Sequence, residues 1–137
     1  MRLMGLDYGS KTVGVALSDP LGLTAEPFET IVRERPGELR KTLRRLEEII
    51  AKKEVGEIVL GLPVHLSGDP SERSEATLLF RDKLVKRTGL PVHLMDERLT
   101  TVEAETVLEE LEVPKKDWKL YVDKIAASLI LKAYMSL

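Results

Sequence analysis

Residues 4–19 read MGLDYGSKTVGVALSD, and this stretch predicts how the fold begins. Two apolar runs, 2–8 and 12–18, flank a short polar turn, so they are expected to form two strands of a hairpin. Asp7 lies inside the first run, where a strand normally buries a side chain. A carboxylate on a rigid strand beside a glycine-containing turn can bind a metal ion or orient a phosphate. The alternative is a residue that caps the turn at a strand end, and its position alone leaves both open.

The rest of the chain predicts a mixed α/β sheet. A third strand, 25–32, follows the Asp19-Pro20 turn and completes an antiparallel meander. Leucine and isoleucine recur at helical spacing after Pro36, which indicates a helix. The later segments alternate, with buried strands at 57–62 and 90–95 and helices at 71–86, at 100–111 and from 122 onward. Three consecutive strands, followed by helices that alternate with strands, predict a mixed sheet with helices on both faces.

Composition narrows the class of protein. The 137 residues include no cysteine and carry a formal net charge of −2. A disulfide scaffold, a thiolate zinc site and a cysteine nucleophile are therefore excluded. No apolar run approaches the ~20 residues that cross a bilayer, and the N-terminus does not resemble a signal peptide. We expect one domain, 1–137, in the cytoplasm, and any contact with phosphates must come from a local basic patch.

Two other places can supply carboxylates to a site with Asp7. Asp96 and Glu97 directly follow a predicted strand, and ligands of α/β sheets gather beyond the carboxyl ends of strands. Neighbours on an extended chain point opposite ways, so only one of the two is expected to face a site. Asp123 stands at the start of the predicted last helix. The alternatives are a solvated acidic pair near a helix N-terminus and, for Asp123, an N-cap.

Three carboxylates that meet repel one another, and a divalent cation relieves that repulsion. Oxygen ligands favour Mg²⁺ or Mn²⁺. Two such ions can stabilise the attacking and leaving oxygens during hydrolysis of a phosphodiester. The acidic set therefore predicts a metal-dependent nuclease with two ions, if its members converge.

Four segments, taken in order, resemble the YqgF family. They are GLDYGSKTVGVALSD (5–19), EIVLGLPVHLSGD (57–69), VHLMDERLTTVEA (92–104) and VDKIAASLILKAYM (122–135). The family consists of Holliday-junction-resolvase-like proteins, regarded as pre-16S rRNA nucleases, of the ribonuclease-H-like superfamily. The resemblance implies a ribonuclease-H-like fold with a five-stranded mixed sheet. It also implies an acidic metal site, and the matching positions are Asp7, Glu97 and Asp123, as catalytic residues and metal ligands.

The chain departs from the family pattern at three positions. Thr12 stands where a basic residue is common, and His65 stands where asparagine is common. Both positions concern substrate contacts more than the acidic set. Junction resolvases of the superfamily also present a further acid from the last helix, where the turn after Asp123 offers Ala126.

Substrate contacts are expected from basic side chains and one loop histidine. The predicted first helix carries a basic cluster, in which Arg44 and Arg45 are the substrate-binding candidates. Lys11 follows Asp7 closely in the chain. The alternative for the cluster is a solvated helix face, partly paired with acidic residues at helical spacing such as Glu47 and Glu48. His65 is a further candidate contact, although a loop histidine more often has no such role.

Several functions fit these observations. The first is a metal-dependent endonuclease that matures the 5′ end of pre-16S rRNA in ribosome biogenesis, with structured RNA and ribosomal precursor particles as partners. The second is a Holliday-junction resolvase acting on branched DNA. A third is a non-catalytic nucleic-acid or transcription-complex binding module, which would gain from losing acids near phosphates. The first motif also resembles the phosphate loop of actin-like kinases, which enclose a nucleotide between two such domains. The expected oligomeric state is a monomer or a weak dimer.

Overall fold

The computed structural model describes residues 1–35, 38–64, 72–97 and 100–137. Five strands form one sheet in the order β3-β2-β1-β4-β5. Their bounds are β1 Arg2–Tyr8, β2 Thr12–Ser18, β3 Ala25–Val32, β4 Val55–Leu62 and β5 Val92–Asp96. The first three strands pair antiparallel, whereas β1, β4 and β5 run parallel. The predicted α/β class and the mixed sheet are confirmed.

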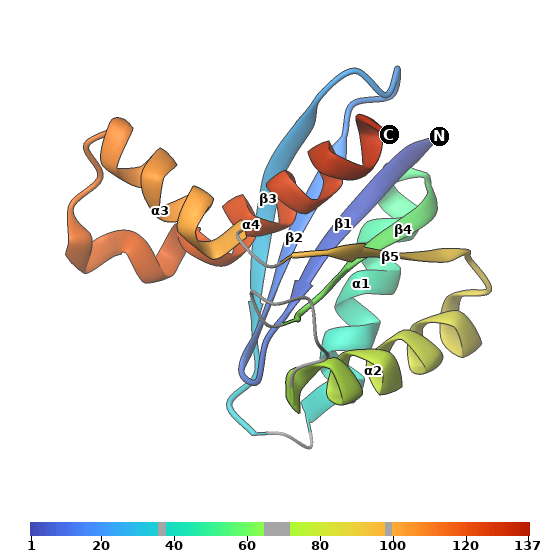
Figure 1. Ribbon diagram of the computed structural model, residues 1–137. Helices are drawn as coiled ribbons and strands as arrows, with labels where there is room; N and C mark the ends of the chain where they lie inside the picture. Colours follow the sequence, from blue (N-terminus) through green and yellow to red (C-terminus); the bar gives the residue numbers. More distant parts are fainter. Residues whose placement is uncertain (36–37, 65–71, 98–99) are drawn as a thin grey trace.

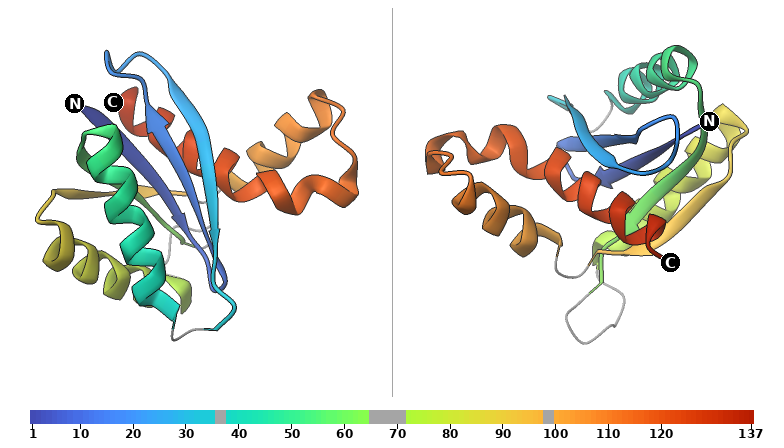
Figure 2. Two further views of the ribbon diagram at one scale, coloured as in Figure 1. Left: turned by 180° about the vertical axis from the view of Figure 1, so that it is seen from behind. Right: turned by 90° about the horizontal axis from the view of Figure 1, so that it is seen from above.

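Helices cover both faces of this sheet. They are α1 (Leu39–Lys53), α2 (Glu72–Thr88), α3 (Thr100–Glu110) and α4 (Trp118–Met135), the last preceded by a short 3₁₀ turn, η2 (Lys115–Asp117). Figures 1 and 2 show α1 and α2 on one face and α4 crossing the other. Helix α3 pairs with the beginning of α4, and the two project beyond the sheet. No helix in the described ranges combines the length and apolarity needed to cross a membrane.

The pleat of the strands divides the core into two parts. Met4 and Leu6 are fully buried in the part covered by α1 and α2. Ala16 and Val59 are fully buried in the part covered by α4. Because successive strand residues point to opposite faces, Asp7 projects on the α4 side of β1. An apolar strand can hold this carboxylate because β1 ends one residue later, and Asp7 faces a cleft lined by polar and charged side chains.

Glycines let α4 lie directly on the sheet backbone. Gly14 is the ladder partner of Asp7 on β2. A Cβ at Gly14 would overlap the carbonyl group of Asp123 and lie 2.9 Å from the amide nitrogen of Lys124. A Cβ at Gly5 would likewise lie 2.8 Å from atoms of α4. The missing side chains therefore set the height of α4 above the sheet and bring Asp123 close to Asp7.

The last helix begins earlier than predicted. It starts at Trp118 rather than near residue 122, because the preceding polar turn, η2, leads directly into it. The Trp118 indole donates a hydrogen bond to the carbonyl of Val113 at 2.9 Å, which fixes the entry to the helix. Asp117 occupies the N-cap position and makes no side-chain capping bond. The N-cap alternative for Asp123 is therefore wrong, since this residue lies inside the helix.

Candidate active site

The three acidic candidates line one cleft of about 350 Å³. It lies where the parallel strands end: Asp7 comes from the end of β1, Glu97 directly follows β5, and Asp123 comes from α4. Asp96 is exposed and does not line the cleft. Strand alternation predicts that only one acid of this pair faces a site, and the choice of Glu97, which the family resemblance implied, agrees with this placement. The solvated alternative holds for Asp96 and not for Glu97.

Asp7 and Glu97 interact directly. The Glu97 carboxyl group donates a hydrogen bond to the Asp7 carboxylate. Burial, and then the negative charge of Asp7, raise the pKa of Glu97 to about 9. Burial also raises the pKa of Asp7, and the charge of Asp123 adds to that effect. Without a cation, burial and the neighbouring carboxylate therefore favour the protonated form of Glu97.

Glu97 occupies a niche made by a glycine. A Cβ at Gly61, on β4, would overlap Oε2 of Glu97 and lie 2.9 Å from its Cδ. This Oε2 atom is shielded from water and has no hydrogen-bond partner in the described ranges. An unsatisfied buried acceptor destabilises the folded state by about 1–3 kcal/mol. Such an oxygen, beside a second carboxylate, fits the donor set of a hard divalent cation.

Asp123 is oriented by a hydroxyl group. Thr12, at the start of β2, donates its hydroxyl hydrogen to Oδ2 of Asp123 at 2.7 Å. Thr12, which stands where a basic residue is common in the family, therefore has a structural role through this contact. It joins the β1–β2 hairpin to α4 across the cleft.

The acidic set is not a closed metal cage. Among the described residues, no three acidic or histidine side chains lie close enough together to hold a metal ion as they stand. Asp7 and Glu97 touch, and Asp123 faces the same cleft while bonded to Thr12. The convergence on which the two-ion prediction depends is therefore partial: the three carboxylates face one cleft, but they do not form a set that holds an ion as they stand.

Two basic side chains also line the cleft. Lys11, predicted as a substrate contact, is exposed at its rim. Arg73, from the first turn of α2, donates a hydrogen bond to the carbonyl of Tyr8 at 2.7 Å. Arg73 was not predicted as a site residue, because the run SERSE around it is typical of a solvated helix start. The predicted contact His65 lies outside the described residues.

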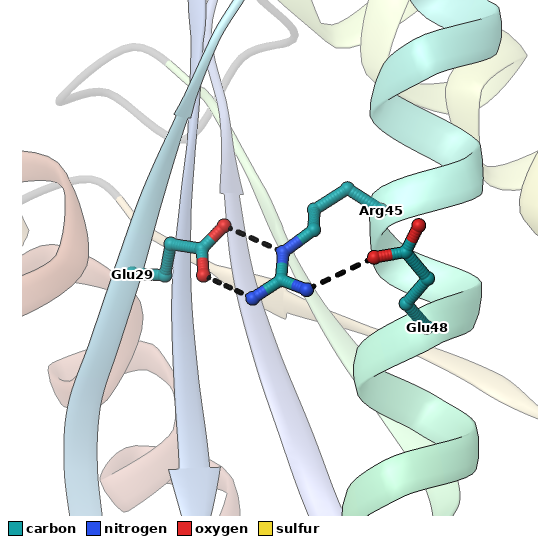
Figure 3. A network of polar contacts seen from close by, with 3 residues as sticks. All are labelled: Glu29, Arg45 and Glu48. Atoms are coloured by element: carbon teal, nitrogen blue, oxygen red, sulfur yellow. Dashed lines mark hydrogen bonds and ion pairs between the residues drawn. The ribbon is translucent and has the colours of Figure 1, made fainter.

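Arg45 is engaged away from the cleft (Figure 3). Its Nε and Nη2 atoms donate to the two carboxylate oxygens of Glu29 at 2.9 and 2.6 Å, and Nη1 donates to Glu48 at 3.1 Å. These bonds raise the pKa of Arg45 above its ordinary value. The alternative of pairing along the helix is correct for Glu48, whereas Glu47 pairs with Arg87. Arg44 is exposed, and the described part of the chain offers it no ion pair.

The two arginines are expected to behave differently in nucleic-acid binding. If the helix face contacts phosphates, Arg44→Gln should lower the slope of log affinity against log salt by about 1. Arg45→Gln should leave the slope unchanged, because its guanidinium is already paired. It should lower the stability of the fold by no more than about 1 kcal/mol, since the pair is partly exposed. Binding titrations of an RNA hairpin over a salt series, with thermal melts, measure both, and an equal loss of slope in both variants would contradict the assignment.

Glu97 should make the metal-free protein less stable as pH rises. Its pKa is about 9 in the folded chain against an ordinary value of 4.5, so between these values the folded state binds more protons than the unfolded state. The stability that this proton contributes is fully present below pH 4.5 and is lost as the pH rises toward about 9. The loss is at most about 1.4 kcal/mol per pH unit. Urea unfolding in EDTA between the two values measures this. Glu97→Gln should flatten the profile, and an equally steep fall in that variant would assign the dependence to other groups.

Comparisons with known proteins agree with the geometry. Residues 1–137 match the family model described as "RuvX: Holliday junction resolvase". A "Putative pre-16S rRNA nuclease" of Lachnospira eligens is 53% identical over 135 residues, covering 98% of this chain and 96% of that protein. One of Halothermothrix orenii is 47% identical over 136 residues, with 99% and 95% covered.

Solved structures show the same fold at low identity. RuvC of T. thermophilus in complex with a Holliday junction substrate superposes with a TM-score of 0.61 at 15% identity, covering 99% of this chain and 96% of that one. The fowlpox virus Holliday junction resolvase superposes at 0.56 with 13% identity, covering 99% and 98%. The ribonuclease-H-like fold is thereby confirmed. Because the family model matches from end to end and relatives share about half of their residues, the chain belongs to the RuvX family of nucleases, as its YqgF-like motifs indicate.

Proposed function

We propose that this protein is a divalent-metal-dependent endonuclease that hydrolyses phosphodiester bonds of structured RNA. Its proposed role is maturation of the 5′ end of pre-16S rRNA, in the cytoplasm, by the single domain 1–137. The observation that carries the proposal is the shared cleft of Asp7, Glu97 and Asp123, contributed by three different elements at the carboxyl ends of the parallel strands. The names of the relatives support the choice of RNA.

The acidic side chains fit a cation better than they fit any structural role. Two carboxyl groups in contact, with a third charge nearby, destabilise the fold when no cation is present. Oε2 of Glu97 lacks a partner within the described ranges, although it is buried. A module that only binds nucleic acid would be stabilised, and would bind better, without these acids. Their presence favours an enzyme over a binding module.

Each side chain has a separate proposed role. Asp7, Glu97 and Asp123 would hold one or two Mg²⁺ or Mn²⁺ ions, which supply charge stabilisation and an activated water when bound. Glu97 must give up its proton to the solvent for this, since a ligating carboxylate is ionised. Thr12 fixes the orientation of Asp123 through its hydroxyl group. Lys11, at the rim, would contact the backbone of the substrate.

A Holliday-junction resolvase is the second candidate, and the description of the family model favours it. Against it stands Ala126, which is buried in α4 where junction resolvases present a further acid. The two activities are separated by one assay with the purified protein. Precursor 16S rRNA and a four-way DNA junction are incubated with Mg²⁺ or Mn²⁺, and with EDTA as control. We expect cleavage of the RNA only with a divalent ion; cleavage of the junction alone would select the second function, and no cleavage of either would overturn the enzyme.

A further inference from the structure

A second cavity of about 270 Å³ adjoins the acidic cleft. The two share Gly9, Ser10 and Arg73 as lining residues, so the β1–β2 turn forms the wall between them. The second cavity is also lined by Arg33, which directly follows β3, and none of its described lining residues is acidic. The two cavities therefore differ in charge. The first presents three carboxylates beside Lys11 and Arg73, whereas the described lining of the second presents the guanidinium groups of Arg33 and Arg73 and no carboxylate.

Arg33 is a buried charge with no counterion among the residues that the structure describes. It is only 4% exposed. Its Nη2 atom donates to the carbonyls of Gly9 at 2.5 Å and Ser10 at 2.7 Å. Its guanidinium lies 4.8 Å from the ring centroid of Tyr8, and its Nη1 atom has no hydrogen-bond partner in the described ranges. Carbonyls and a ring face offset part of the cost of burying a charge, but neither supplies a negative charge.

Arg73 adds a second positive charge to the same cavity. Its bond to the Tyr8 carbonyl holds the guanidinium against the turn. Neither Arg73 nor Arg33 forms an ion pair with any residue that the structure describes. Arg73 also feels the carboxylates of Asp7 and Glu97 in the adjoining cleft, because its charge offsets part of the rise that burial causes in the pKa of both. On the side of the second cavity it faces the like charge of Arg33, and an anion bound between the two guanidinium groups would remove that repulsion.

The chemistry of the cavity selects an oxyanion. Guanidinium groups present planar forks of N–H donors that match the oxygens of a phosphate. The neighbouring cleft is the proposed place of a scissile phosphodiester, and a nucleic-acid strand that enters it carries further phosphates on either side. We propose that Arg33 and Arg73 form a binding site for a backbone phosphate of the substrate strand, next to the phosphate that is cleaved. This inference rests on the proposed nuclease function.

The site should differ from the acidic cleft in its dependence on metal. Carboxylates repel a phosphate unless a cation is present, whereas two guanidinium groups attract it without one. Binding through the arginine site should therefore persist in EDTA, where no cleavage takes place. This difference allows the site to be tested apart from catalysis.

The test compares Arg73→Gln with wild type in EDTA. Affinity for a labelled RNA hairpin is measured over a salt series. Loss of one phosphate contact should lower the slope of log affinity against log salt by about 1 and lower the affinity at low salt by roughly 10-fold. Arg73→Lys should restore the slope but not the full affinity, because an ammonium lacks the fork. Arg81→Gln, on the same helix but lining neither cavity, should match wild type.

A second measurement uses inorganic phosphate. At matched ionic strength in EDTA, phosphate should raise the melting temperature of wild type and of Arg81→Gln more than that of Arg73→Gln. Arg33 is left intact, because it holds the β1–β2 turn and its loss would confound binding with folding. An unchanged salt slope in Arg73→Gln overturns the proposal. If phosphate still stabilises wild type in that case, the cavity takes a free anion and not the strand.

Failure of this inference is distinguishable from failure of the proposed function. If wild type cleaves RNA with Mg²⁺ while Arg73→Gln keeps its full salt slope, only the arginine site is overturned. If wild type binds RNA through Arg73 in EDTA but never cleaves it, only the enzymatic function is overturned.

Discussion

Asp7→Asn is expected to lower nuclease activity by about 10³-fold, the upper range for losing one charge-stabilising group from an active site. The amide keeps the size of the side chain and its place on β1 but removes the charge that would balance a cation. The fold should be unaffected or slightly stabilised in EDTA, since one of two buried carboxyl groups in contact is neutralised. The asparagine amide can also donate a hydrogen bond to Glu97.

Three measurements check this result. Cleavage is assayed with Mg²⁺, and thermal melts are recorded in EDTA and in Mg²⁺. Wild type should gain stability from the ion, because a ligand that binds only the folded state stabilises it, and Asp7→Asn should lose most of that gain. Asp96→Asn is the matched control: it removes the same charge from an exposed residue next to Glu97 that does not line the cleft. It should keep its activity within a few fold.

Two outcomes would contradict the assignment. A large loss of stability of Asp7→Asn in EDTA would indicate a structural role at the strand end. If Asp96→Asn loses as much activity as Asp7→Asn, then Asp96, and not Glu97, is the acid that should have been assigned to the site.

Short-range patterns account for what was predicted correctly. Alternating apolar residues and turn signals define β1, β2 and β3, and the switch to helical spacing marks the later elements. Strand alternation predicts that only one of Asp96 and Glu97 faces a site, and the family motif then selects Glu97. Family motifs were needed for Asp123, whose position in the chain alone was equally consistent with a helix cap.

The features that were not predicted from the sequence depend on contacts between distant segments of the chain. Arg73 and Arg33 act through backbone carbonyls of the β1–β2 turn, which no periodicity connects to them. Arg45 has a partner on β3, and the helical spacing that was considered shows only its second partner, Glu48. The start of α4 was missed because the polar segment before Trp118 carries no apolar period.

The role of Gly14 is the clearest example of a feature that a sequence pattern cannot predict. Gly14 sits in an apolar strand where a glycine weakens the strand by itself. The glycine is needed because the α4 backbone at Asp123, far later in the chain, lies directly against it. Only the packed arrangement shows that no side chain fits there.

Gly14→Ala is expected to have the largest effect on stability. The new Cβ would overlap the Asp123 carbonyl, and the obstructing atoms are backbone and cannot rotate aside. Helix α4 must shift away from the sheet, which should lower the free energy of unfolding by about 3 kcal/mol, the upper end of typical overpacking. The melting temperature should fall by about 10 °C for a chain of this size.

The same shift should also reach the acidic cleft, because Gly14 is the ladder partner of Asp7 and supports the turn of α4 that carries Asp123. Activity at a temperature where the variant is fully folded should still fall, and the stabilisation by Mg²⁺ should shrink. Gly56→Ala is the control: it adds a methyl group to β4 against the flexible Met1 side chain only, and it should be nearly neutral. If Gly14→Ala matches Gly56→Ala in both stability and Mg²⁺ response, the height of α4 does not depend on this glycine. If Gly14→Ala is unstable yet keeps its full Mg²⁺ stabilisation and activity when folded, Asp123 is not positioned by this contact.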